Sequence, residues 1–215
     1  MDLSSLDFIS EATDRFCLIP MKEDRFEYNF DDGIYELAKG EIVRVIYTQP
    51  NHEGRLLDFC KAHGIVCYLP LKKVWKPMTQ RHDGKIYQYP KVVLRPMFPN
   101  YMFVKMMLEQ RTLLFNSKSI IRILQDSDEL QPKLLDEIRV IRQIENIAKD
   151  EDIEFNAELT EGDKFLIENG PWQGVFGWLK KKKNRFLWMV EIECVGTIVR
   201  ATIDPSQYKM TRVEE

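Results

Sequence analysis

Hydrophobic and polar positions change their spacing several times along the chain, and each change predicts a new element. Residues 42–48 form a short apolar, β-branched run that is typical of a buried strand. Asn51 follows and is expected to cap a helix that Gly64 ends. Residues 65–75 return to a strand pattern, in which Pro70 marks an edge or a bulge.

The next segment predicts a long basic hairpin. Asp83 and Gly84 form a typical two-residue turn, and basic residues flank it on both sides. Apolar residues then resume in the stretch FPNYMFV, residues 98–104, which begins abruptly after a Pro-Asn pair. Side chains alternate between two faces of a strand, so Tyr101 and Phe103 are expected to point to the same side.

Helical spacing returns in the following region. A short helix is expected over residues 107–117 and a strand over 120–124. Apolar positions then recur every three or four residues, and Pro132 suits a first turn, which predicts a helix over 132–149. Residues 41–149 are therefore expected to form an α+β domain, with helices packed on an antiparallel sheet.

The two ends of the chain differ from this middle. Residues 1–40 form an acidic N-terminal extension, in which a short strand or hairpin is expected around residues 26–30. Residues 150–158 are acidic and show no period, so they are expected to be a linker. Residues 159–212 contain five short strand-like segments separated by turns, which fits a small five-stranded β-barrel.

The net charge of −3 hides an uneven distribution. Residues 1–40 carry −6, residues 41–150 carry +6 and residues 151–215 carry −3. A basic middle between acidic ends is compatible with a domain that works near nucleic acid, although a randomly mixed surface also explains a value this small.

Catalytic and metal-binding patterns are absent from the sequence. It contains no P-loop, GxSxG or HExxH motif, so the protein is not expected to be an enzyme. Cys60, His63 and Cys67 lack a fourth partner at a metal-ligand spacing, so buried free thiols are expected instead, with no metal and no cofactor. No apolar run reaches the roughly 18 residues that span a membrane, and a soluble cytoplasmic protein is expected.

Several stretches together resemble the NusG family of transcription elongation factors, with the spelling of its specialised RfaH-like members. They are IVRVIYTQPN followed by a helix, GIVCYLPL, the FPNYMFV strand and GDKFLIENGPWQGVFGWL. The last resembles a KOW motif, with Gly170, Gly174 and Gly177 at the spacing of its turn. The resemblance implies an N-terminal NusG (NGN) domain followed by an SH3-like KOW barrel.

The same resemblance implies a polymerase-binding surface. It assigns Tyr47, Phe98, Tyr101 and Phe103 to a hydrophobic patch that docks on the clamp helices of bacterial RNA polymerase. Aromatic side chains at the centre of a patch suit such a contact, which requires Tyr101 and Phe103 to be exposed. Burial in the core is the alternative for both rings.

Basic residues add a candidate nucleic-acid surface. Arg55 and Lys118 match family positions near non-template DNA, and the hairpin contributes Lys73, Lys76 and Arg81, since lysine and arginine neutralise phosphates. Solvated surface charge is the alternative for each. Gln49 stands where RfaH-like members have a basic residue. Residues 180–183 are four consecutive lysines, either a solvated hairpin tip or an RNA contact.

The sequence therefore predicts a monomeric elongation or antitermination factor. Its NGN domain is expected to bind RNA polymerase, and its KOW domain to recruit a partner, for which the family offers a small-subunit ribosomal protein or Rho. Dense β-formers between residues 186 and 203 favour strands over the helical hairpin that RfaH adopts. The alternative is a KOW-containing RNA-binding or ribosome-associated protein.

Overall fold

The computed structural model describes residues 26–82, 85–124, 128–155, 157 and 162–213. The helices among them are α2 (Glu53–Ala62), α3 (Gln110–Phe115) and α4 (Gln131–Ile147), with short 3-10 turns η2 (Asp32–Tyr35), η3 (Asp128–Leu130), η4 (Glu193–Val195) and η5 (Pro205–Gln207). The strands of the first half are β1 (Glu41–Thr48), β2 (Cys67–Tyr68), β3 (Leu71–His82), β4 (Lys85–Pro96), β5 (Tyr101–Met107) and β6 (Ile120–Leu124). Those of the second half are β7 (Ile153–Phe155), β8 (Asp163–Ile167), β9 (Phe176–Lys182), β10 (Arg185–Ile192), β11 (Thr197–Ile203) and β12 (Met210–Arg212).

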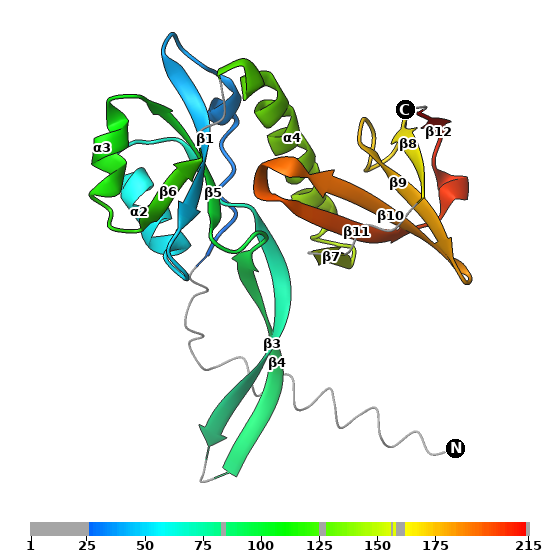
Figure 1. Ribbon diagram of the computed structural model, residues 1–215. Helices are drawn as coiled ribbons and strands as arrows, with labels where there is room; N and C mark the ends of the chain where they lie inside the picture. Colours follow the sequence, from blue (N-terminus) through cyan, green and yellow to red (C-terminus); the bar gives the residue numbers. More distant parts are fainter. Residues whose placement is uncertain (1–25, 83–84, 125–127, 156, 158–161, 214–215) are drawn as a thin grey trace.

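A four-stranded antiparallel sheet in the order β2-β5-β1-β6 is the centre of the first half. Because side chains alternate along each strand, Ile46 and Met102 face α2 and α3 on one side. Val45 and Phe103 face α4 and residues 30–37 on the other side. The expected α+β arrangement of helices on an antiparallel sheet is confirmed, with α4 covering one face along its length (Figure 1).

Two polar side chains fix α4 to the strands. Gln131 accepts a hydrogen bond from the Val43 backbone N–H at 2.8 Å and donates to its carbonyl at 2.9 Å, on the edge of β1 away from β5, because the pairing with β6 begins only at Val45. Glu145 is 1% exposed and accepts hydrogen bonds from the Leu71 backbone N–H at 2.7 Å and the Tyr68 hydroxyl at 3.1 Å. These contacts satisfy buried backbone groups that would otherwise be unpaired.

Strands β3 and β4 form a two-stranded hairpin, called the arm here, which projects away from the sheet (Figure 1). The strands pair in register from Leu71 opposite Pro96 to His82 opposite Lys85, which leaves a two-residue connection as the sequence predicted. The connecting residues 83 and 84 lie outside the described residues. Leu71 and Val93 at the root are buried, whereas most of the arm is exposed.

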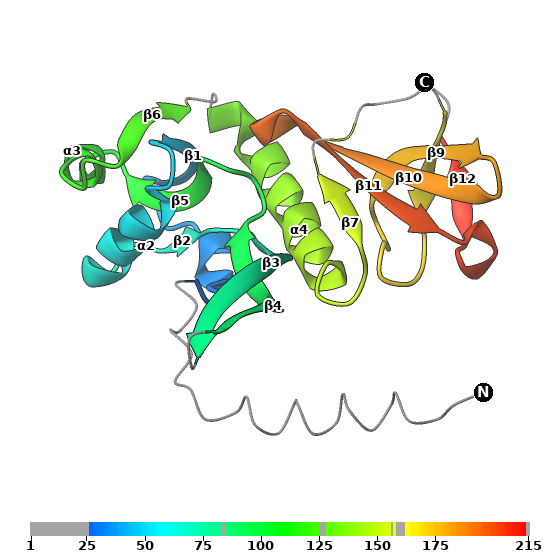
Figure 2. The same cartoon turned by 90° about the horizontal axis from the view of Figure 1, so that it is seen from below.

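The second half is a six-stranded antiparallel sheet in the order β12-β8-β9-β10-β11-β7, called the C-terminal sheet here. Trp172 and Trp188 are completely buried in its core. Figure 2 shows α4 lying between this sheet and the four-stranded sheet. Polar contacts join the parts: Gln143 on α4 donates to the carbonyls of Pro171 and Gln173, and Glu137 accepts from the Cys194 backbone N–H.

Some local predictions were wrong. Asn51 does not cap α2, because it lies before the cap at φ +62° and His52 is the N-cap residue. Residues 26–31 are not a strand; they pack through Phe26 and Phe30 against the two cores. The expected linker contains β7, which pairs with β11. Among the described residues, no helix is long and apolar enough to cross a membrane.

Candidate functional site

The turn before β5 explains why this strand begins so abruptly. Asn100 takes a left-handed conformation at φ +70°, and its backbone N–H donates to Glu53 Oε1 at 2.9 Å. Its carbonyl accepts from the Thr48 N–H at 2.8 Å, which ties the turn to the end of β1. Glu53 is only 4% exposed, so it acts as an internal clamp and places Tyr101 at the first position of β5.

Three side chains from neighbouring strands form a surface row, called the tyrosine row here: Tyr101 on β5, Tyr47 on β1 and Arg122 on β6. The register places Tyr47 directly opposite both of the others. The two tyrosine rings meet at 5.2 Å between centroids, and the Arg122 guanidinium carbon lies 5.4 Å from the Tyr47 ring centre. Both tyrosines are half-buried, so the row is a supported yet accessible aromatic surface with a cation at one end.

The other two members of the predicted polymerase patch are not exposed. Phe103 is completely buried, with its ring 6.0 Å from the Tyr68 ring beneath residues 30–37. Phe98 is 3% exposed and meets the Phe155 ring of β7 edge-on at 6.1 Å. The expectation that Phe103 shares an exposed face with Tyr101 was wrong: the two do share a face of the sheet, but α4 and the N-terminal segment cover that face at Phe103.

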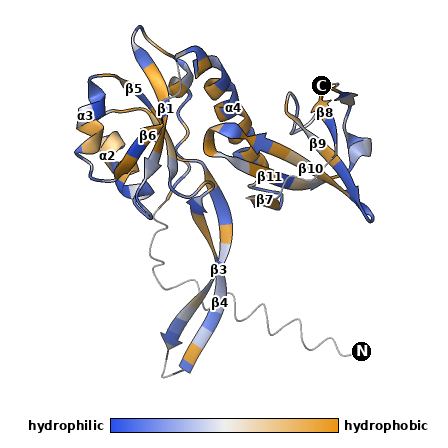
Figure 3. Cartoon of the chain, in the orientation of Figure 1, coloured by the Kyte–Doolittle hydropathy of each residue, from blue (hydrophilic) through white to orange (hydrophobic). Residues whose placement is uncertain are grey.

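The two faces of the arm differ in composition. Residues directly opposite one another in an antiparallel pair share a face, so the register separates two sets. One face carries mainly apolar groups between basic ones, namely Lys73, Trp75, Pro77, Arg81, Ile86, Pro90 and Val92. The other face carries mainly basic and aromatic groups, namely Lys72, Lys76, Tyr87, Tyr89, Lys91 and Arg95. Figure 3 shows the hydrophilic and hydrophobic bands that result along the arm.

Individual positions on the arm favour ligand contact through its faces. Lys76 lies directly opposite Lys91, an arrangement of like charges that disfavours the pair in the absence of an anion. Pro77 lies opposite Pro90, so neither residue offers an N–H to an added strand at this point of the edges. Trp75 is 71% exposed, which is unusual for so large an apolar group.

The predicted basic residues do not form a single cluster. Lys73 and Arg81 lie on the Trp75 face and Lys76 on the opposite face, and Lys73 Nζ donates to the carbonyl of Lys149 at 2.7 Å. Arg55 on α2 and Lys118 in the turn before β6 are both exposed, on the side of the sheet that α2 and α3 cover.

Lys72 lies near the root of the arm, where it contacts β7. Its ammonium lies 4.1 Å from the Phe155 ring centre. Burial lowers the pKa of Lys72. The arm and β7 are therefore in contact at this point.

The predicted turn glycines lie in and beside one loop of the C-terminal sheet. Gly170 and Gly174 adopt positive φ values of +75° and +81°, a conformation that side chains disfavour. Gly177 lies inside β9, where a Cβ atom would come within 2.5 Å of the Met189 carbonyl oxygen. The three glycines therefore have structural roles, and the described residues contain no group of His, Cys, Asp or Glu that could hold a metal ion.

Residues that sequence reasoning missed are mostly polar groups acting across the fold. Glu53, Gln131 and Glu145 each bind backbone N–H groups far away in sequence. Arg122 completes the tyrosine row from an edge strand. The alternation of IIRIL could have placed Arg122 on a surface, but only the register shows which face it shares.

Taken together, the described residues form a mixed α/β protein with antiparallel sheets, an aromatic surface and a basic arm. Residues 44–144, a little under half of the chain, match the family model described as transcription termination factor NusG. Among curated proteins, none matches the chain.

Similar solved structures include a crystal structure of the MjSpt4:Spt5 complex in conformation B. The matched chain is 12% identical, and the match covers 81% of this chain and 99% of that one, with a TM-score of 0.23.

Proposed function

We propose that this protein is a transcription elongation factor that binds RNA polymerase through the tyrosine row of its NusG-family domain. The observation that carries the proposal is the location of the row: Tyr47 and Tyr101 lie on paired strands inside the segment that matches the family model. The clamp formed by Glu53 and Asn100 fixes one end of the row in advance. A preformed aromatic surface loses little conformational freedom on binding.

The arm supplies the second contact in this proposal. Its basic faces approach the DNA of the elongation complex, because lysine and arginine neutralise backbone phosphates and a two-stranded ribbon is narrow enough to enter a groove. Lys76 and Arg81 are exposed on opposite faces, so the arm can contact phosphates from either side. The protein acts by binding alone, as a specialised factor that favours continued transcription.

The C-terminal sheet is the third part of the proposal. It is a KOW-type domain that recruits a further protein to the transcribing complex. The turn with positive φ values at Gly170 and Gly174 and the close strand approach at Gly177 support this reading. The small-subunit ribosomal protein and Rho remain the candidate partners implied by the resemblance.

A titration with bacterial core RNA polymerase tests the central contact. The variant is Tyr47→Ala/Tyr101→Ala, and the control is Phe176→Ala, which removes a ring that is 52% exposed on the C-terminal sheet. Loss of two central aromatic anchors is expected to weaken binding by about 30-fold or more, whereas the control changes it less than about threefold. Circular dichroism and thermal melts establish that each variant is folded. Equal affinity of the double variant and wild type would reject the tyrosine row as the polymerase site.

A further inference from the structure

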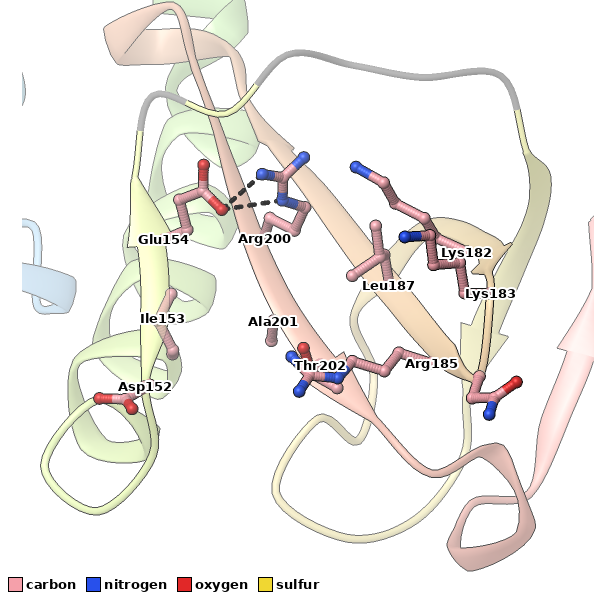
Figure 4. Close-up of a pocket in the computed structure, with 11 residues that line it drawn as sticks. Asp152, Ile153, Glu154, Lys182, Lys183, Arg185, Leu187, Arg200, Ala201 and Thr202 are labelled. Carbon is pink, nitrogen blue, oxygen red and sulfur yellow. Dashed lines mark hydrogen bonds and ion pairs between the residues drawn. The ribbon is translucent and has the colours of Figure 1, made fainter.

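A groove runs along the C-terminal sheet between β7 and the β9–β10 hairpin. Its volume is about 930 Å³. Figure 4 shows Lys182, Lys183 and Arg185 on one side of it and Glu154 and Arg200 on the other. Leu187 lies between the two sides, and no aromatic residue is among those that line the groove.

Strand register explains how the basic groups come together. Lys182 pairs with Arg185, and Lys180 pairs with Leu187, which is two residues further along β10. Paired residues and residues two apart share a face, so these cations lie on the same face as Leu187. Lys181 pairs with Phe186 and therefore lies on the opposite face. The run of lysines is thus divided between two faces by the pleat.

One carboxylate moderates the charge of the groove. Arg200 donates to Glu154 Oε2 through Nε at 3.0 Å and through Nη2 at 2.5 Å. The Glu154 side chain is 56% exposed and that of Arg200 is 23% exposed, so the pair is accessible from the groove. Among the described residues, no ion pair joins Lys182, Lys183 or Arg185 to a carboxylate. The hairpin side of the groove is therefore rich in unneutralised positive charge.

We propose that this groove binds the sugar–phosphate backbone of a single-stranded nucleic acid. Lys182 and Arg185 are directly opposite each other, with Cα atoms about 5 Å apart, so their long side chains can reach successive phosphates of an extended strand. Two strands bound the groove on opposite sides, which suits a flexible single strand better than a rigid duplex. Since no ring lines it, bases find no stacking platform, and recognition is by charge and independent of base identity. This site is separate from the tyrosine row and from the arm.

Fluorescence anisotropy with labelled oligouridine and oligothymidine of about 12 nucleotides tests the proposal. The full chain carries Lys73→Gln/Lys76→Gln/Arg81→Gln as background, so that the arm contributes little to binding. Each lost phosphate contact is expected to weaken binding about fivefold near 0.1 M salt. Lys182→Gln/Arg185→Gln should therefore weaken binding about 25-fold. Lys181→Gln, from the opposite face of the same run, should change it less than about twofold.

The Glu154→Gln variant is expected to bind the oligonucleotides more tightly, whereas the lysine and arginine variants bind them more weakly. Removing this carboxylate frees Arg200 for a phosphate, so binding should become about fivefold tighter. RNA and DNA binding equally would indicate backbone recognition alone, whereas preference for RNA would identify RNA as the ligand; both support the groove. Three outcomes would overturn the proposal for the groove. They are equal losses of affinity in the Lys181→Gln and Lys182→Gln/Arg185→Gln variants, no binding of either oligonucleotide, and binding of oligoglutamate alone. The titration with RNA polymerase does not depend on these outcomes. A wrong assignment of the groove can therefore be distinguished from a wrong assignment of the tyrosine row as the polymerase site.

Discussion

Replacing Glu145 by leucine tests how the arm is held at its root. The substitution keeps an apolar body of similar size and removes both acceptor oxygens. The Leu71 N–H and the Tyr68 hydroxyl, now bound at 2.7 and 3.1 Å, would be left buried without that partner. Each orphaned donor costs about 1–3 kcal/mol, so the free energy of unfolding should fall by roughly 2–6 kcal/mol. Arg142, which also pairs with Glu145, is partly exposed and can turn toward solvent, so it adds little.

Urea denaturation measures this loss, with two variants for comparison. Glu145→Gln retains an acceptor for the Leu71 N–H and should lose only about 1 kcal/mol. Asp136→Asn removes an exposed carboxylate from the same helix, paired only with Arg139, and should lose less than about 0.5 kcal/mol. Hydrogen exchange at the Leu71 amide should accelerate in the leucine variant. If Glu145→Leu matches Asp136→Asn in stability, or leaves that amide protected, the reasoning is refuted.

Three further predictions follow from other parts of the fold. Gln131→Leu should destabilise the protein by about 1–3 kcal/mol in urea titrations, because the Val43 N–H loses its side-chain acceptor while the Val43 carbonyl retains the Arg44 Nη1 donor at 3.2 Å; an unchanged urea midpoint would contradict this. Gly177→Ala should cost about 1–3 kcal/mol through overpacking against β10, and thermal melts that coincide with wild type would exclude that contact. Burial raises the pKa of Tyr35 to about 12 and raises the pKa of Tyr68 above its ordinary value. In the unfolded chain these two tyrosines lose their hydroxyl protons at lower pH than in the folded protein. Their contribution to the free energy of unfolding should therefore be fully present below about pH 10 and should decrease as pH rises further. Tyrosinate absorbance and urea midpoints measured together check this, and stability that stays constant up to about pH 12 would count against it.

The elements with a strong period were predictable from sequence. The helix over 132–149 is found at Gln131–Ile147, and the strand over 120–124 is found at Ile120–Leu124. The hairpin register, with His82 opposite Lys85, agrees with the position of the Asp-Gly signal in the sequence. In each case a local signal, either apolar spacing or turn chemistry, is strong enough to decide the structure without knowledge of distant residues.

Burial of the predicted site could not be read in the same way. Alternation places Tyr101 and Phe103 on one face, but the sequence does not show that α4 and residues 30–37 cover only part of that face. The acidic segment that contains β7 likewise gave no strand signal. β7 forms because it can pair with the free edge of β11 in the C-terminal sheet, and that edge exists only in the folded tertiary structure.

The pairing of β7 with β11 sets the reach of everything attached to the C-terminal sheet. While β7 is paired, only residues 148–152 separate it from the end of α4, a span of at most about 17 Å. Release of β7 together with the contacts of Gln143 and Glu137 would leave 15 residues, 148–162, between α4 and β8, a chain length that can span at most about 50 Å. Effective concentration falls roughly as the −3/2 power of tether length, which is about fivefold for this change. The pairing of β7 therefore helps to determine how closely a molecule bound to one half of the protein is presented to a molecule bound to the other.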